Sequence, residues 1–109
     1  MDKDIEFVKS SGNVFSDLGI AQPEEMLAKA EIVYRISQII SHRHLTQKQA
    51  ADLLGLTQPK VSNIIAGRLD GFSLEKLLFL MVKLDRDVQI VIKKKPRTRE
   101  HAHLNVAYA

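Results

Sequence analysis

Residues 45–67 read L-T-Q-K-Q-A-A-D-L-L-G-L-T-Q-P-K-V-S-N-I-I-A-G, and this stretch predicts two short helices joined by a tight turn. Thr46 is a good N-cap, and Gln49 three residues later completes a capping box. Gly55 is expected to end the first helix, because glycine adopts the left-handed conformation without steric cost. Thr57 caps the second helix. Two short capped helices joined by a turn that contains glycine are typical of a helix-turn-helix.

The second of these helices has an apolar side and a polar side. Helical spacing places Val61, Ile64 and Ile65 together, and we expect them to face the core. In a helix-turn-helix this second helix enters the DNA major groove, with its N-terminal residues against the base edges. Glutamine and asparagine pair with adenine, lysine reaches guanine, and serine adapts to several bases. The candidate base contacts are Gln58, Lys60, Ser62 and Asn63. The alternative is an ordinary pair of packed helices with a solvated polar face.

With these residues in register, the stretch resembles the XRE family of Cro- and CI-type repressors. The matching residues are Thr46-Gln47, Ala50-Ala51, Gly55, Thr57-Gln58, Val61-Ser62 and Ile65-Ala66-Gly67. The resemblance implies a mainly all-α fold, a compact lambda-repressor-like DNA-binding domain of four to five helices. It also implies phosphate contacts from Gln47, Thr57 and Arg68. Pro59 stands where many relatives have a polar residue, so that position is expected to give only apolar or backbone contact.

The wider chain is similar to a narrower group, the HigA-like antitoxins that are encoded with toxins of the RelE type or of a related phage type. The segments S-G-N-V-F-S-D-L-G-I near the N-terminus and D-V-Q-I-V-I near the C-terminus carry this similarity. It implies a repressor that autoregulates its operon and neutralises a small basic toxin. The alternatives are a stand-alone, prophage-like regulator without a toxin, and a protein-interaction module on the same fold.

Composition narrows the class of protein. The chain has 109 residues and 45% apolar residues, which suits one domain with a single small core. It has no cysteine, no apolar run long enough to span a membrane and no signal-peptide pattern, so we expect a cytoplasmic protein. Motifs for nucleotide binding, zinc proteolysis and serine hydrolysis are absent, and we expect neither an enzyme nor a cofactor. The pairs His42-x-His44 and His101-x-His103 lack further ligands in register, so we expect no metal site.

The net charge of +3 is unevenly distributed. Residues 1–30 hold six acidic and three basic side chains, whereas residues 93–109 hold five basic and one acidic. A basic tail of this kind either lies along DNA phosphates or only keeps the chain soluble. The candidate tail phosphate contacts are Lys93, Lys94, Lys95 and Arg97.

We divide the chain into an arm (residues 1–22), a helix-turn-helix domain with a C-terminal strand (23–93) and a basic flexible tail (94–109). The arm carries an apolar cluster that either packs on the domain or binds the toxin. The residues of this cluster proposed for toxin binding are Val14, Phe15 and Leu18.

Two further helices and one strand are predicted around the motif. A helix over residues 23–42 is expected to bury Met26, Leu27, Ala30, Val33, Ile36, Ile39 and Ile40. A helix capped by Ser73 is apolar over more than one face, which suggests a dimer interface. A β-branched strand follows, and because a lone strand needs a partner, we expect it to pair with a second copy or with the toxin. Its candidate pairing residues are Val88, Ile90 and Ile92. A homodimer would match a palindromic operator in double-stranded DNA.

Overall fold

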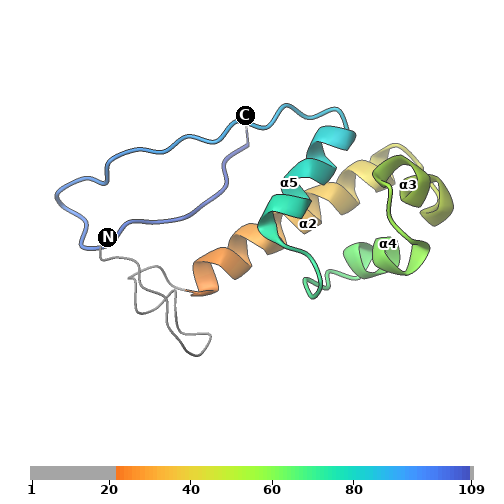
Figure 1. Cartoon of the computed structure of the whole chain (residues 1–109), viewed down its shortest axis with the longest axis horizontal. Coiled ribbons are helices and arrows are strands. Elements are labelled where there is room, and N and C mark those ends of the chain that lie inside the picture. The colour runs from red at the N-terminus through yellow and green to blue at the C-terminus, as the bar shows by residue number, and fades with distance from the viewer. Residues whose placement is uncertain (1–21, 109) are drawn as a thin grey trace. The chain divides into compact units, whose positions relative to one another are not determined.

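The computed structural model describes residues 22–108, and this part of the chain contains helices and no strand. The helices are α2 (Gln22–His42), α3 (Gln47–Leu54), α4 (Gln58–Ile65) and α5 (Leu74–Lys83), coloured from orange to cyan in Figure 1. The mainly all-α fold expected from the sequence is therefore confirmed for the described residues. The apolar cluster of the arm, Val14, Phe15 and Leu18, lies outside them.

Residues 29–90 form one compact unit, which contains the helix-turn-helix. Within it α3 contacts both α4 and α5. The residues of this unit that are buried and apolar are Ile32, Val33, Ile36, Ile40, Ala50, Ala51, Leu54, Val61, Ile64, Phe72, Leu77, Leu80, Met81 and Leu84. Each helix of the unit contributes to this core, so α3 and α4 are held by burial and not by helical propensity alone.

Two basic side chains tie the ends of helices in this unit to one another. Lys83 Nζ donates to the backbone oxygen of Leu54, the last residue of α3, at 3.3 Å. Arg43 Nη2, just after α2, donates to the backbone oxygen of Leu84 at 2.9 Å. The last carbonyl groups of a helix have no partner within the helix, so these contacts satisfy acceptors that would otherwise be left to solvent.

The buried face of α2 differs from the prediction. Ile32, Val33, Ile36 and Ile40 are buried, but Met26, Leu27 and Ala30 are exposed. Met26 and Leu27 precede the compact unit of residues 29–90. They are apolar, but they are not part of the core of that unit. The prediction extended one apolar stripe along the whole helix, and this was wrong for its first turns.

The predicted C-terminal strand is not formed in the described residues. Residues 86–96 have no regular secondary structure, and Val88, Ile90 and Ile92 are exposed. A strand requires a hydrogen-bonded neighbour, and within residues 22–108 none pairs with this segment. The β-branched composition could not supply the second strand that pairing requires, so the strand assignment was wrong for the single chain.

The remaining described residues, 22–28 and 91–108, belong to a second unit. Here Glu24 holds the returning C-terminal segment with both carboxylate oxygens. Oε2 lies 2.7 Å from His103 Nδ1, and Oε1 accepts a hydrogen bond from the backbone N–H of Leu104 at 3.2 Å. These two hydrogen bonds lower the pKa of Glu24 below its usual value of 4.5. The bond from the Leu104 N–H has the larger effect, and the bond with the His103 side chain has the next largest.

This attachment is expected to be lost in acid. Because the pKa of Glu24 is lowered in the folded state, the contact stabilises the attached segment above the usual carboxyl pKa and weakens as the pH falls through the lowered value. The backbone amide resonance of Leu104, followed by NMR during acidification, should shift as Glu24 is protonated. Glu24→Gln is the matched control and should remove this titration. A Leu104 amide that responds to acid equally in both proteins would contradict the contact.

Candidate nucleic-acid interface

The first helix of the motif begins and ends as its sequence predicts. Thr46 Oγ1 accepts from the Gln49 N–H at 3.0 Å, and Gln49 Oε1 accepts from the Thr46 N–H at 2.8 Å, which completes the capping box. At the other end Gly55 has φ +69°, the left-handed conformation that favours glycine. The helix therefore stops where the turn to α4 must begin.

The second helix is fixed in the same manner. The hydroxyl of Thr57 accepts from the Lys60 N–H at 3.4 Å, and Pro59 lies in the first turn. Val61 and Ile64 are completely buried, which anchors α4 against the core through one side. Ile65 was also expected to face the core, but it is about half exposed, so that expectation was wrong.

The four candidate base contacts all lie on α4. Gln58, Lys60 and Ser62 are exposed, and Asn63 is half-buried. The burial of Val61 and Ile64 directs the opposite side of the helix, including Pro59 and Ser62, toward solvent. Gln58 lies at the very start of the helix, the end that approaches base edges in this type of motif.

Lys60 and Asn63 have partners that the sequence did not reveal. Lys60 Nζ lies 6.0 Å from the centre of the Phe72 ring, within range of a cation–π contact. Asn63 Oδ1 accepts a hydrogen bond from Arg68 Nη1 at 3.3 Å. Contacts between a helix and a loop do not follow a helical period, so the sequence pattern did not predict the contact between Lys60 and Phe72. The only sequence signal for it was the aromatic side chain of Phe72 just after the glycine-containing loop.

The candidate phosphate contacts lie at the helix ends of the motif. Gln47 is the first residue of α3 and is exposed, Thr57 is the N-cap of α4, and Arg68 follows α4 directly. The hydroxyl of Thr57 is already an acceptor within its own helix cap. The candidate tail contacts Lys93, Lys94, Lys95 and Arg97 are exposed and belong to the second unit.

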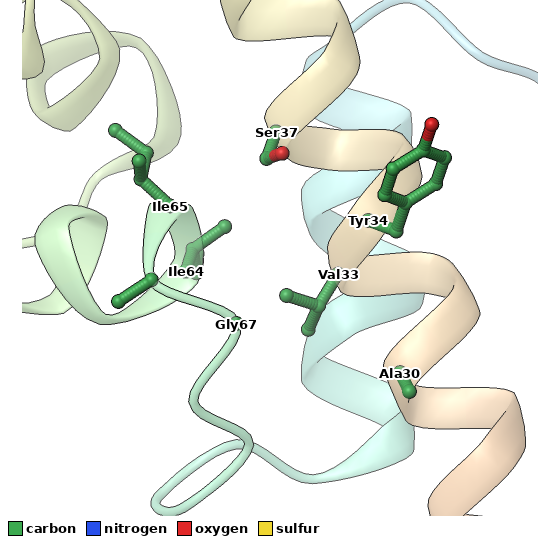
Figure 2. Close-up of a pocket in the computed structure, with 8 residues that line it drawn as sticks. Ala30, Val33, Tyr34, Ser37, Ile64, Ile65 and Gly67 are labelled. Atoms are coloured by element: carbon green, nitrogen blue, oxygen red, sulfur yellow. The ribbon is translucent and has the colours of Figure 1, made fainter.

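A groove of about 250 Å³ lies beside the C-terminal end of α4. Figure 2 shows Val33 and Tyr34 of α2 on one side of it and Ile64 and Gly67 on the other. The Tyr34 side chain is exposed, although it belongs to an apolar stretch of α2. The groove is mostly apolar, and it adds no charged group to the candidate interface.

Neither a metal site nor a membrane span is found where the structure is described. No group of three or more metal-ligating side chains comes together within residues 22–108. Over the same residues, no helix combines the length and hydropathy needed to cross a bilayer.

Comparison with known proteins defines the class. A family model described as a helix-turn-helix domain matches residues 14–93. A solved structure described as an XRE family transcriptional regulator is similar to this chain at 43% sequence identity and a TM-score of 0.77. The match covers 82% of this chain and all of that one. A search of curated proteins gave no match. The chain therefore belongs to the XRE family of helix-turn-helix proteins, as its sequence motifs indicated.

Proposed function

We propose that the chain is a sequence-specific transcriptional repressor that binds double-stranded DNA through α4. The main support for this proposal is that α4 has one buried apolar side and one exposed polar side. One side is completely buried at Val61 and Ile64, and the other presents a polar surface that begins at Gln58. A helix fixed in this way can enter the major groove without rearrangement of the core. The family to which the chain belongs, and the regulator named above, support the same function.

In the proposed complex, Gln58, Lys60 and Ser62 face base edges, with Asn63 beside them. Gln47, Thr57 and Arg68 bind phosphates on either side of the groove, and the basic tail adds contacts that do not depend on sequence. The cation–π contact holds the Lys60 ammonium toward Phe72, so we expect Lys60 to contribute at the edge of the interface and Gln58 and Ser62 to contribute at its centre.

We propose further that the repressor is a homodimer paired through α5. Phe79 and Val82 lie three residues apart on one side of this helix, and their side chains are 58% and 51% exposed. Together they form an exposed apolar surface of the kind that often marks a protein–protein interface. If two copies of α5 pack antiparallel about a twofold axis, Phe79 of one meets Val82 of the other.

Val82→Asp is expected to weaken dimerisation by about tenfold or more, because the twofold axis introduces the new charge twice at one interface. Light scattering coupled to size-exclusion chromatography over a concentration series measures this directly. Leu53→Asp is the matched control, since Leu53 is an exposed leucine on α3. Equal dimer affinity for both variants would exclude α5 as the interface.

The more specific proposal is an antitoxin that autoregulates its operon and neutralises a small basic toxin of the RelE or HigB-like type. Its support is the similarity of the chain to HigA-like antitoxins and the acidic balance of residues 1–30. The segment with exposed Val88, Ile90 and Ile92 belongs to no strand among residues 22–108, and it would offer its backbone to a partner strand, either from a second copy or from the toxin. The arm cluster at Val14, Phe15 and Leu18 is a second candidate contact.

Purification of the tagged protein from its native locus, with mass spectrometry of what accompanies it, tests the antitoxin proposal. Recovery of one small basic protein at equal stoichiometry supports it. Recovery of the protein alone, still bound to its own promoter, favours a stand-alone regulator of the same family. Failure to bind the promoter in either state would favour a protein-interaction module.

A further inference from the structure

The loop that follows α4 is locked to the helix through its backbone. Gly67 has φ +79°, its N–H donates to the Ile64 oxygen at 3.0 Å, and the Arg68 N–H donates to the Asn63 oxygen at 2.8 Å. This pair of bonds around a left-handed glycine is a Schellman motif, which ends a helix in one defined geometry. The backbone of Arg68 is thereby fixed beside the last turn of α4.

The side chains repeat this connection. Arg68 Nη1 donates to Asn63 Oδ1 at 3.3 Å. A guanidinium has donors only, so the amide of Asn63 must present its oxygen to Arg68 and turn its NH₂ group the other way. Asparagine reads adenine by using its oxygen and its NH₂ group together on one base edge. In this structure the amide oxygen of Asn63 binds Arg68 instead, and this hydrogen bond also sets the orientation of the amide plane.

The location of Arg68 favours a phosphate as its ligand. Arg68 lies beyond the C-terminal end of α4, whereas base edges are contacted from the N-terminal part of such a helix. Arginine in a defined orientation binds a phosphate with two parallel hydrogen bonds. Lys60 Nζ lies 6.0 Å from the centre of the Phe72 ring, at the other end of the loop that begins with Arg68.

We propose that Asn63 is a positioning residue that orients the Arg68 guanidinium toward a DNA backbone phosphate, and that base reading falls to Gln58 and Ser62, with Lys60 at the edge of the interface. This inference rests on the proposed DNA-binding function. It assigns Asn63 a role different from the one that its residue type indicated, because the sequence gives residue types but not the hydrogen bonds that occupy them.

A double-mutant cycle tests this role. The wild type, Asn63→Ala, Arg68→Ala and the double variant are titrated against an operator selected from a random duplex library and against an unrelated duplex, at several salt concentrations. Arg68→Ala should weaken binding to both duplexes on the order of tenfold and reduce the salt slope by about one. Asn63→Ala should weaken both duplexes by a smaller, equal factor, and the double variant should bind like Arg68→Ala.

Base reading by Asn63 would give the opposite pattern. Asn63→Ala would then lose affinity for the operator only, at one base pair, and its effect would multiply with that of Arg68→Ala. That result would overturn the inference. Gln58→Ala is the control, since it should reduce the preference for the operator over the unrelated duplex. If neither Gln58→Ala nor Arg68→Ala changes binding, the proposed DNA-binding surface itself is wrong, which is distinct from an error about Asn63.

Discussion

Ser62→Glu is expected to abolish operator binding while leaving the fold intact. Ser62 is exposed on the polar side of α4, next to the completely buried Val61, so the new side chain meets no core residue. In the proposed complex this position faces the major groove, where a carboxylate would approach the phosphates and acceptor atoms of DNA. Such like-charge juxtaposition costs several kcal/mol, which corresponds to about a hundredfold loss of affinity or more. Fluorescence anisotropy with labelled operator measures the loss, and circular dichroism verifies the fold.

The matched control is Ser62→Gln, which has nearly the size of glutamate but no charge. It should retain far more affinity than Ser62→Glu, because glutamine pairs with base edges and its introduction adds no repulsion. If both variants lose binding equally, the effect is steric and says nothing about charge. If Ser62→Glu binds like the wild type, this side of α4 does not face DNA.

Leu54→Ala is expected to destabilise the domain by about 2–5 kcal/mol. Leu54 is the last residue of α3, and its side chain is completely buried in the core of the unit formed by residues 29–90. The truncation removes apolar contacts and leaves a cavity at the point where the turn of the motif begins. For a domain of this size such a loss is a large fraction of the free energy of unfolding. Urea denaturation followed by circular dichroism gives the change.

Leu53→Ala tests whether burial is the cause. Leu53 precedes Leu54 in the same helix but is 41% exposed. Its truncation should cost well under half as much, because much of the side chain already contacts water. Equal destabilisation by the two variants would mean that the core is not arranged around Leu54 as described.

The features that sequence analysis predicted correctly are local ones. The capping box at Thr46 and Gln49, the left-handed Gly55 and the cap at Thr57 each involve residues within a few positions of one another. Local hydrogen bonds and backbone preferences determine such features, so residue type and spacing suffice. The same reasoning placed Gln58, Lys60, Ser62 and Asn63 on a single helix.

The features that were wrong or missed depend on contacts distant in the sequence or absent from one chain. The segment with Val88, Ile90 and Ile92 has the composition of a strand, but composition does not provide the second strand that a sheet needs. Ile65 has helical spacing suited to the core, yet it is half exposed beside a groove. The bond from Arg68 to Asn63 depends on the path of a loop, which no periodicity encodes.

Gln58 is the residue at the start of α4, and its replacement shows whether the N-terminal part of this helix reads DNA bases. The measurement is the ratio of affinities for the selected operator and for operators with each base pair changed in turn, for the wild type and for Gln58→Ala. We expect the variant to lose discrimination at one base pair in each half-site, worth about 1–3 kcal/mol, and to keep it elsewhere. A Gln58→Ala protein with the same discrimination as the wild type at every position would show that Gln58 does not read a base.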